Sequence, residues 1–488
     1  MNSVVPQPHF LAVDWWALGP VIALSVGAML ILMLEFLPKS RGNRGPIVAL
    51  LTLAAAAYSV WKVRDVRRAL FEGMYVHDGF TVFFVLLFCA ITAISVLLSW
   101  DYVKRTRIPQ PEYYALMLSS TLGMIIMAAS NDLITFFVGL ELMSLALYVL
   151  VGFRRSRLES SEAALKYFLL GAFASGFLLY GIALLYGATG TTNLTAMSAF
   201  LSDTPLLKNP LLIVGSVLLL TGFAFKIAAV PFHMWTPDAY EGAPTTVTGY
   251  MSVGAKAAAF AGLLRVVING LDGLQADWKP ILIALAILTM TVGNVTALLQ
   301  NNVKRMLAYS SIAHAGYILV AVVVGGASGG AAALFYLAVY ALMNLGAFGL
   351  LGILGRDRDE RVLIADLRGL GFRQPLIGIA FAIFMLSLGG IPPTAGFMAK
   401  IFIFGVAIDA GYMPLVIVSV LNSVVSIFYY LRVTVALYMQ EPQGEATPIS
   451  WSVPSMAGVL VALGLTIWWG LQGNALLEQA RRSMLGLM

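Results

Sequence analysis

The sequence contains a single cysteine, and this scarcity excludes several classes of site. Cys89 stands inside an apolar run, VFFVLLFCAITAISVLL. One thiol cannot form an intrachain disulfide, a CxxC redox motif or the four-cysteine ligand set of an iron–sulfur cluster. The sequence also lacks a glycine-rich phosphate loop, a GxSxG motif and a dinucleotide fingerprint. We therefore expect this chain to hold no cofactor and no metal of its own.

Charged residues are scarce as well. They make up 11% of the 488 residues, whereas 60% are hydrophobic, and soluble domains carry about 25% charged residues. The formal net charge of +6 does not indicate nucleic acid, because most basic residues stand in short loops where positive-inside topology explains them. The composition predicts a polytopic membrane protein whose surroundings are the lipid bilayer, with no nucleic-acid partner.

Apolar segments long enough to cross a bilayer recur along the whole chain. A transmembrane helix needs about 20 predominantly apolar residues. We therefore predict an all-α polytopic membrane protein with about 14 transmembrane helices. The predicted spans are 17–36, 46–62, 79–99, 112–129, 132–152, 161–187, 210–230, 245–268, 280–299, 303–324, 329–354, 375–408, 413–438 and 453–471.

The basic residues of the loops predict an orientation. If the amino terminus lies outside, 16 lysines and arginines fall in inner loops and 8 fall on the opposite side. This bias favours both termini on the outer, periplasmic face, although the loop at 62–78 runs against the rule.

Six basic residues fall inside the predicted spans. Lysine at the middle of a bilayer costs about 2.5 to 3.5 kcal/mol on insertion scales, so an intramembrane lysine is a functional candidate by default. The two arginines stand near span ends, where we expect them to extend to the membrane interface. The six residues are Lys166, Lys226, Lys256, Arg265, Lys400 and Arg432.

Among the acidic residues, Glu141 is the one that the pattern places well inside a span. A carboxylate that approaches or leaves a buried lysine can switch it between its charged and neutral forms. We therefore assign Glu141 the role of modulating Lys226 in a proton relay, with a static buried ion pair as the alternative. Lys166 follows Glu162 by four residues, so a local helix pair is also open to it.

Prolines interrupt two of the spans beside lysines. Pro231 lacks an N–H and leaves the carbonyl of Ile227 without its helical partner, and Pro392 and Pro393 do the same ahead of Lys400. Non-helical backbone at membrane depth is tolerated where it is buried in protein or lines a wet cavity. We expect one discontinuous helix at each place, although prolines also kink transmembrane helices that transport nothing.

A short internal repeat relates these two regions. The pattern G-F-x-x-K-I occurs at 222–227 and again at 396–401, and a similar offset lays Asn131-Asp132 over Asn301-Asn302. We infer two related halves of five spans each. An odd number of spans makes the halves inverted, as in many transporter folds.

These halves divide the chain into four parts. The parts are three leading helices at 1–110, a first repeat at 111–270, a second repeat at 279–440, and a last helix with its tail at 441–488.

Two histidines are further candidates for a proton path, because the side-chain pKa of histidine lies near 6.5. His233 follows Pro231, and His314 stands mid-span in SSIAHAGYILV, between Lys256 and Lys400 along the chain. A histidine that only hydrogen-bonds a neighbouring helix is the alternative for each. Two distant histidines without nearby cysteine or carboxylate ligands make a poor metal site.

Several stretches resemble the antiporter-like subunits of respiratory complex I, the proton-translocating NADH:quinone oxidoreductase. They cover about residues 110–440. The resemblance implies a translocase subunit in the membrane arm, in a bacterial cell inner membrane, with fourteen helices and two inverted five-helix repeats. The stretches are LELMSLALYVLVGF, SSEAALKYFLLGAFASGFLLYGIALLYG, GFAFKIAAVPFHMWTPDAYEGAPTTVTGYMSVGAK, NNVKRMLAYSSIAHAGYIL and GGIPPTAGFMAK.

By position, the resemblance assigns roles to individual residues. Glu141 is similar to the family's glutamate on helix 5, and Lys166, Lys226 and Lys256 to its lysines on helices 6, 7 and 8. Lys400 is similar to the helix 12 lysine that exchanges protons with the outside. Lys400 also favours the subunit N branch, because the M branch usually carries glutamate there, and the tail after 473 leaves no room for the L branch's lateral helix.

The resemblance also implies partners. NADH, FMN, iron–sulfur clusters and quinone are expected in other subunits, and quinone reduction there would drive the relay. Subunit M and small membrane subunits are the expected neighbours. Two alternatives stay open: a large subunit of a multisubunit sodium/proton antiporter, which shares this fold and these lysines, and a structural spacer with vestigial charges.

Overall fold

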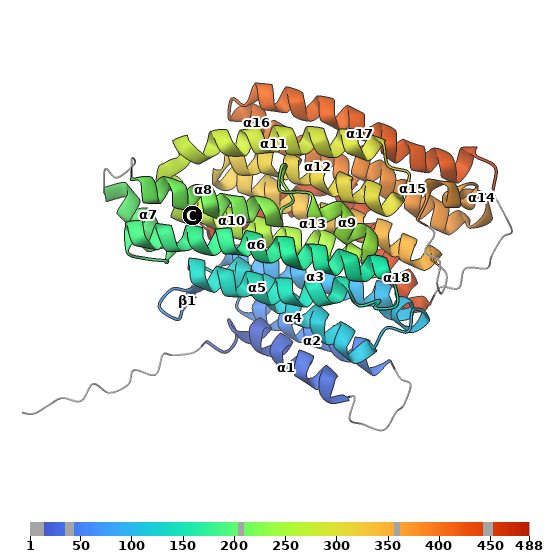
Figure 1. Cartoon of the computed structure of the whole chain (residues 1–488), viewed down its shortest axis with the longest axis horizontal. Coiled ribbons are helices and arrows are strands. Elements are labelled where there is room, and N and C mark those ends of the chain that lie inside the picture. The colour runs from blue at the N-terminus through green and yellow to red at the C-terminus, as the bar shows by residue number, and fades with distance from the viewer. Residues whose placement is uncertain (1–13, 35–42, 204–208, 356–361, 443–451, 488) are drawn as a thin grey trace, which may run out of the picture.

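The computed structural model describes residues 14–34, 43–203, 209–355, 362–442 and 452–487. These parts fold into nineteen α-helices and one two-stranded hairpin, and most helices run along the long axis of a single bundle (Figure 1). A π-helical stretch, Val266–Gly270, continues α10. The helices are α1 Gly19–Met33, α2 Arg44–Lys62, α3 Gly79–Arg105, α4 Gln110–Ala129, α5 Leu133–Val151, α6 Leu158–Thr189, α7 Leu194–Asp203, α8 Pro210–Lys226, α9 Trp235–Gly242, α10 Thr245–Arg265, α11 Gln275–Leu298, α12 Val303–Val324, α13 Gly326–Leu354, α14 Leu370–Arg373, α15 Pro375–Gly389, α16 Ala395–Asp409, α17 Met413–Met439, α18 Val453–Leu471 and α19 Gly473–Leu485.

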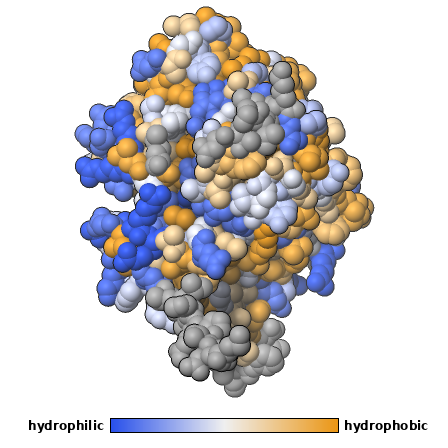
Figure 2. All heavy atoms as spheres, turned by 90° about the vertical axis from the view of Figure 1, so that its left-hand side faces the viewer, coloured by the Kyte–Doolittle hydropathy of each residue, from blue (hydrophilic) through white to orange (hydrophobic). Residues whose placement is uncertain are grey.

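All fourteen predicted spans correspond to helices of this bundle. Within the described residues, eleven helices are long and apolar enough to cross a membrane, and α1, α8 and α15 are shorter apolar helices. Large apolar side chains cover much of the outer surface of α1, α6, α11 and α17, as expected where lipid or another subunit is the neighbour. The end-on view in Figure 2 shows the hydrophilic residues that mix with this apolar surface at one end of the bundle.

The two proline-marked spans are discontinuous, as the sequence predicts. In the first, α8 ends at Lys226 and the chain leaves helical geometry until α9 begins at Trp235. In the second, α15 ends at Gly389 and α16 begins at Ala395. Proline cannot donate the backbone hydrogen bond that would continue either helix. Each break therefore frees carbonyl groups inside the bundle.

Short strand-like bridges close the two halves in the same way. Residues 131–133 pair with 192–194 through two backbone hydrogen bonds, and residues 301–303 pair likewise with 362–364. In Figure 1, α7, which follows the first bridge, lies at the left end of the bundle, whereas α14, which follows the second, lies at the right end. Equivalent segments therefore lie at opposite ends, as inverted repeats require. The residue boundaries of the four predicted parts stay predictions.

The same offset relates two helix caps. Asp132 accepts hydrogen bonds from the second and third backbone N–H groups of α5, both at 2.9 Å. Asn302 does this for α12, at 2.9 and 3.3 Å. Aspartate and asparagine are among the preferred N-cap residues because their side chains satisfy N–H groups that have no helical partner. The repeated Asn-Asp and Asn-Asn pairs thus mark equivalent helix starts.

The centre of the bundle is formed by α10 and α13. Every residue of α10 is buried, and so is every residue of α13 from Gly329 to Leu354. Helix α10 belongs to the first predicted repeat and packs against α12 and α13 of the second. A polar side chain on α10 is therefore held between the two halves.

The expectation for Arg265 was wrong. Arg265 does not extend to the interface; it is 1% exposed and forms a bidentate ion pair with Asp78, the N-cap of α3. The carboxylate comes from a segment nearly two hundred residues away, so no local pattern could indicate it. Arg432 donates to the carbonyls of Leu298 and Gln300, at the end of α11.

Two further elements were not predicted. The loop at 62–78 folds into an antiparallel hairpin of β1, Arg68–Leu70, and β2, Tyr75–His77. The tail forms the amphipathic helix α19, which packs against α3 and α13. Neither stretch has the long apolar run by which the spans were recognised.

Candidate functional site

Lys226 ends α8 at the first break and lies in an aromatic, hydroxyl-lined site. Its Nζ donates to Ser144 Oγ at 2.8 Å and lies 3.5 Å from the hydroxyl of Tyr148, both on α5. The ring centroids of Tyr148, Tyr167 and Phe225 lie 5.6 to 5.9 Å from Nζ, within the range of a cation–π interaction. The side chain is buried, with 5% of its surface exposed. Neutral groups therefore provide the contacts of this ammonium.

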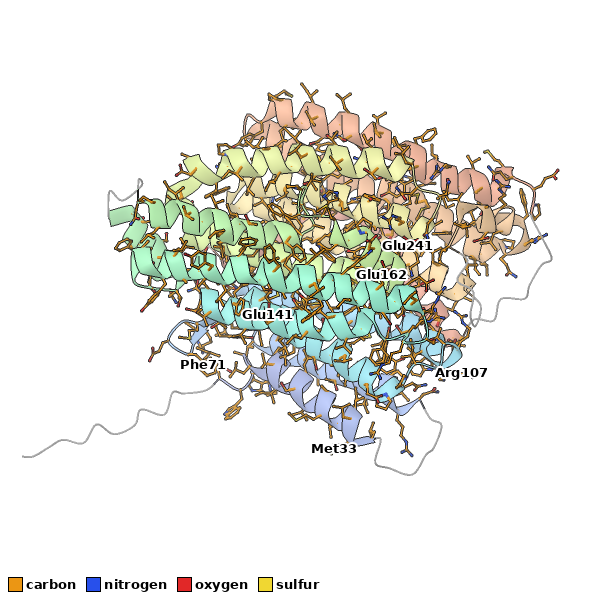
Figure 3. The ribbon with its side chains drawn as sticks, in the orientation of Figure 1. Met33, Phe71, Arg107, Glu141, Glu162 and Glu241 are labelled. Carbon is orange, nitrogen blue, oxygen red and sulfur yellow. The ribbon has the colours of Figure 1, made fainter. Side chains whose placement is uncertain are left out.

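Glu141 stands three residues before Ser144 and so shares its face of α5. Glu141 lies part way along the bundle (Figure 3), and its Oε1 accepts a hydrogen bond from Ser175 on α6 at 2.5 Å. The described residues show no ion pair between Glu141 and Lys226. The alternative of a static, direct ion pair is therefore not what this structure contains.

Lys256 lies at the middle of the bundle, on α10. Its Nζ donates to both the carbonyl and the hydroxyl oxygen of Ser311 on α12, at 2.5 Å each. Only 3% of the residue is exposed. Because α12 belongs to the second half, these hydrogen bonds join the two halves at a titratable group.

His314 lies one helical turn beyond Ser311 on α12 and connects three helices. Its Nδ1 is 2.7 Å from the hydroxyl of Tyr336 on α13, and its Nε2 is 3.1 Å from the hydroxyl of Tyr430 on α17. Tyr430 also hydrogen-bonds Ser310. The imidazole is fully enclosed, and both of its nitrogens have hydroxyl partners that can accept or donate.

Lys400 stands on α16, directly beyond the second break. Its Nζ donates to the carbonyl of Gly389, the last residue of α15, at 2.8 Å, and to Ser423 Oγ on α17 at 2.8 Å. Ser426 lies 3.5 Å away, and the ring of Tyr317 is 5.2 Å from Nζ. The Gly389 carbonyl is one that the proline pair was expected to free. The lysine therefore occupies the place of the missing helical N–H.

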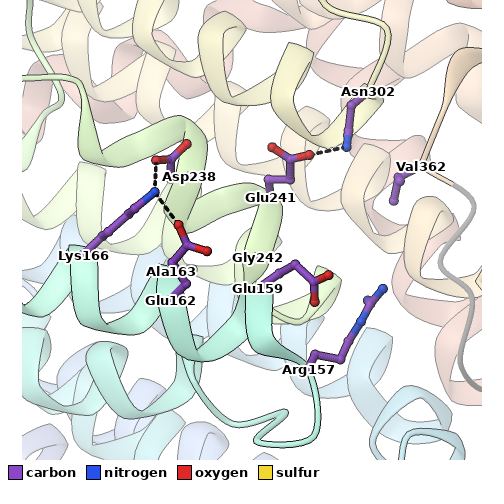
Figure 4. Close-up of a pocket in the computed structure, with 10 residues that line it drawn as sticks. All are labelled: Arg157, Glu159, Glu162, Ala163, Lys166, Asp238, Glu241, Gly242, Asn302 and Val362. Atoms are coloured by element: carbon purple, nitrogen blue, oxygen red, sulfur yellow. Dashed lines mark hydrogen bonds and ion pairs between the residues drawn. The ribbon is translucent and has the colours of Figure 1, made fainter.

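Lys166 lies apart from this buried group, in an ion-pair cluster that lines an open cavity of about 410 Å³ (Figure 4). Its Nζ is 2.7 Å from Glu162, the predicted i,i+4 partner, and 2.9 Å from Asp238 on α9. Arg305 on α12 binds Asp238 at 2.9 Å and Glu241 at 2.7 Å. The Lys166 side chain is 45% exposed. The cluster therefore ties α6, α9 and α12 together at one mouth of the bundle.

Asp238 is the shared acceptor of this cluster. Partial burial acts to raise the pKa of its carboxyl, but hydrogen bonds from Lys166 and Arg305 outweigh burial and hold the pKa below its usual value of 3.8. The carboxylate therefore stays ionised over the physiological pH range.

His233 is the predicted site residue with the weakest contacts. It lies in the connection between α8 and α9, is partly buried, and has no hydrogen-bond partner at Nδ1. The neighbouring Trp235 fixes this connection: its indole donates to the carbonyl of Phe225 at 3.0 Å and stacks on Tyr167 at 4.5 Å.

The partners of the lysines escaped sequence reasoning. Serine and tyrosine carry no intramembrane cost that singles them out, so Ser144, Ser311, Ser423 and Tyr430 gave no separate signal. The spacing of Ser144 from Glu141 was the one available clue. Within the described residues, no group of three histidine, cysteine, aspartate or glutamate side chains could hold a metal ion. The assignment of NADH, FMN, iron–sulfur clusters and quinone to other subunits stays a prediction.

Comparison with known proteins adds the family. Residues 130–426 match the family model described as NADH:quinone oxidoreductase/Mrp antiporter, TM. NADH-quinone oxidoreductase subunit N of Trichlorobacter lovleyi is 43% identical over 476 residues, which cover 97% of this chain and 98% of that protein. The subunit N of Chloroflexus aggregans is 44% identical, with 92% of each chain covered.

Solved structures agree. A chain of respiratory complex I from Thermus thermophilus with bound aureothin superposes with a TM-score of 0.80 at 38% identity, covering 94% of this chain and 98% of that one. A chain of the Mrp complex from Dietzia sp. DQ12-45-1b has a TM-score of 0.84 at 24% identity, with 97% of each chain covered, so that likeness concerns the fold alone. This chain therefore belongs to the antiporter-like family of complex I membrane subunits, on the branch named NADH-quinone oxidoreductase subunit N.

Proposed function

We propose that this chain translocates protons across the membrane through a relay of buried groups, driven by quinone reduction in other subunits of the complex. One observation carries the proposal. Lys226, Lys256 and Lys400 are each at most 5% exposed, and their direct hydrogen-bond partners are neutral hydroxyl and carbonyl oxygens. A buried ammonium without a direct counter-ion is costly, whereas lysine can give up its proton. Such a lysine suits a proton carrier better than a structural ion pair.

The relay begins at Glu141 and Lys226. Lys226 is hydrogen-bonded to the hydroxyl of Ser144, and Glu141 to the hydroxyl of Ser175. A small movement of α5 relative to α8 would change the distance between Glu141 and Lys226 and hence the charge of Lys226. Such a movement is easiest at the break after Lys226, where the backbone has no helical hydrogen bonds to lose. Glu141 therefore modulates, and Lys226 loads and unloads.

The relay continues across the middle. Lys256 receives the proton, and the hydroxyls of Ser310, Ser311 and Tyr430 lead with His314 toward Lys400. In this proposal the proton passes from Lys226 to Lys256 through water. Lys400 exchanges protons with the outside.

Two residues stand at the approaches. Lys166, with its exposed cavity, serves the entrance side, and His233 lies beside the first break. Both termini face the periplasm of a bacterial inner membrane in this proposal, and subunit M and small membrane subunits are neighbours.

The test is proton pumping coupled to NADH oxidation in membrane vesicles. For Lys226→Ala and Glu141→Gln we expect an assembled complex, judged by native electrophoresis, with both pumping and NADH oxidation sharply reduced. Lys62→Ala, which removes an exposed lysine stacked on Trp16, is the control and keeps both rates. An assembled Lys226→Ala complex in which pumping and NADH oxidation both match the wild type would refute the relay.

The sodium/proton antiporter is the second candidate, because the family model that matches names both machines and the fold is shared with an Mrp complex. The same vesicles distinguish them. If Lys226→Ala leaves NADH oxidation unchanged and abolishes sodium/proton exchange, the antiporter function is correct. The high identity to subunit N proteins favours the first function.

A further inference from the structure

The two halves place an arginine at equivalent points. Arg265 at the end of α10 donates from Nε to the carbonyl of Ala128, near the end of α4, at 2.7 Å. Arg432 on α17 donates to the carbonyl of Leu298, the end of α11, at 3.1 Å. Ala128 and Leu298 stand 170 positions apart, the same offset that relates the caps Asp132 and Asn302. Each arginine thus closes the end of the corresponding helix in its half.

The remaining N–H groups of Arg265 bind a carboxylate that comes from outside the first repeat. Asp78 accepts from both terminal nitrogens of Arg265, at 3.0 and 2.9 Å, and Thr81 accepts at 2.8 Å. Asp78 is also the N-cap of α3, with its Oδ1 2.7 Å from the backbone nitrogen of Thr81. A bidentate pair of this kind is among the strongest hydrogen-bonded arrangements of arginine. Helix α3 packs on α4 and α10 and brings the carboxylate with it.

The second arginine has no such partner. Within the described parts of the chain no carboxylate pairs with Arg432, and its Nε is buried without a hydrogen-bond acceptor. A buried donor that is left unsatisfied is unfavourable, because it has lost its hydrogen bond to water without gaining another. Among the described residues, the site on the second half therefore lacks the carboxylate that fills its counterpart on the first half.

The surface beside Arg432 is also uncovered. An apolar stripe follows α17 at helical spacing, with Ile417, Leu421, Val424 and Phe428 each more than half exposed, and it leads to Arg432. Helices α11 and α17 lie at the upper edge of the bundle in Figure 1. They are the counterparts of α4 and α10, on which α3 packs. The position that α3 occupies on the first half is thus open on the second.

We propose that the α11–α17 face binds a transmembrane helix of a neighbouring subunit, and that an aspartate or glutamate at the N-cap of that helix pairs with Arg432. The first half of the chain already contains such an arrangement: α3 packs on α4 and α10, and its N-cap Asp78 pairs with Arg265. We expect a helix rather than lipid, because one rigid element must supply both the carboxylate that pairs with Arg432 and the apolar side chains that cover the exposed stripe of α17. This proposal concerns assembly and does not depend on the proton relay.

Photo-crosslinking of the assembled complex identifies the occupant. A photoreactive amino acid at Phe428 or Leu431, both solvent-accessible on α17, is activated in native membranes and the products are analysed by mass spectrometry. We expect crosslinks to the first turns of a transmembrane helix in another subunit, beside an acidic N-cap residue. Crosslinks to lipid alone, or to a helix without an acidic residue there, would overturn the proposal.

Charge exchange tests the pair itself. Arg432→Gln keeps an N–H donor for the α11 carbonyls but removes the charge, and we expect at least a fivefold increase in complex that has lost the neighbour on native gels at raised salt. Arg481→Gln, an exposed arginine near Glu478, is the matched control. If Arg432→Asp disrupts assembly, replacing the crosslinked acid by arginine should restore it. Failure of that rescue, or unchanged assembly in Arg432→Gln, would exclude the pair.

Discussion

At the scale of single residues, the lysines of this protein differ in the groups that accept hydrogen bonds from their ammonium. Lys166 contacts two carboxylates in an open cluster, while the buried relay lysines Lys226, Lys256 and Lys400 contact hydroxyl and carbonyl oxygens. The two arginines also differ, since Arg265 pairs with Asp78, whereas the acceptors of Arg432 among the described residues are backbone carbonyls. Burial alone therefore does not define function. Among the lysines, the nature of the acceptor separates a fixed charge from a movable proton, whereas arginine keeps its proton with either kind of acceptor.

The Ser144 hydroxyl is the closest contact of Lys226, so we predict that Ser144→Ala slows pumping. A hydrogen bond to a charged group is worth about 1.5 to 3 kcal/mol, and Tyr148 at 3.5 Å is a poor substitute. Proton pumping per vesicle should fall about tenfold or more while the native gel shows a full complex.

The control for this prediction is Ser119→Ala. Ser119 also lies on a membrane-spanning helix and bonds the carbonyl four residues before it, as Ser144 does in addition to its lysine contact. Equal pumping by the two variants would mean that the Ser144 hydroxyl does not support Lys226.

Sequence reasoning was strongest for these residues and weakest for their partners. Lys226, Lys256 and Lys400 were recognisable because a charged group in an apolar run is expensive. Asp78 was not, since it stands at the edge of a polar loop and becomes buried only when α3, α4 and α10 meet. The contacts of Arg265 span the chain, and no local period encodes them.

At the scale of elements, the second broken helix depends on a close backbone approach. Gly396 opens the second G-F-x-x-K-I motif, and a Cβ there would lie 1.8 Å from the carbonyl oxygen of Ser387. The side-chain hydroxyl of Ser387 accepts from the backbone N–H of Gly396 at 3.2 Å. No rotamer change can relieve a clash with backbone. The glycine therefore fixes how closely α16 approaches α15.

We predict that Gly396→Ala displaces the second half-helix and moves Lys400 away from Gly389. Thermal stability of the purified complex should fall, and pumping should fall with it. Gly405→Ala on the same helix is the matched control, because nothing lies within 4 Å of its Cβ position; alanine there should be neutral or stabilising by up to about 1 kcal/mol. If both variants behave alike, the close approach has no structural importance.

The docking of α9 should depend on pH in a defined direction. Because the pKa of Asp238 is lower in the folded state than its ordinary value of 3.8, its contribution to stability is complete above that value and is lost as the pH falls below it. We expect the protection factors of the α9 amides, which correct exchange rates for their intrinsic pH dependence, to be unchanged between pH 5 and 8 and to fall below about pH 4.

Asp238→Asn provides the comparison. The amide cannot pair ionically with Lys166 and Arg305, so exchange in α9 should be faster already at neutral pH and should show a smaller step on acidification. A wild-type step located between pH 5 and 8 would show that another group controls this docking.

The prediction of elements succeeded where one signal was sufficient. Proline explained both breaks, and apolar length explained the spans. The β1–β2 hairpin and α19 depend instead on what they pack against: Tyr75 is buried and bridges to Ser130, and α19 lies on α3 and α13. Short polar segments take their structure from such tertiary contacts rather than from their own composition.

At the scale of the whole molecule, the inverted repeat explains both the symmetry and its limits. The caps, the bridges and the arginine contacts recur, which is why a six-residue motif and one pair of asparagines were enough to predict two halves. The halves are not equal, because α10 lies between them while its counterpart α17 lies at the surface. That asymmetry places Lys256 in the interior and leaves Arg432 at a free face.

The leading helices and the second half are further joined by α19. Met484 is fully buried and fits against α13 where Gly330 has no side chain, since a Cβ there would lie 2.3 Å from the Met484 Cε. We predict that Met484→Ala costs about 2 to 5 kcal/mol through the cavity that it leaves and lowers the apparent unfolding temperature of the purified complex. Leu485→Ala, at a side chain that is 67% exposed, should change it little. If the two variants unfold at the same temperature, α19 does not hold the bundle together, and the tail is an appendage whose packing adds nothing to the union of α3 with α13.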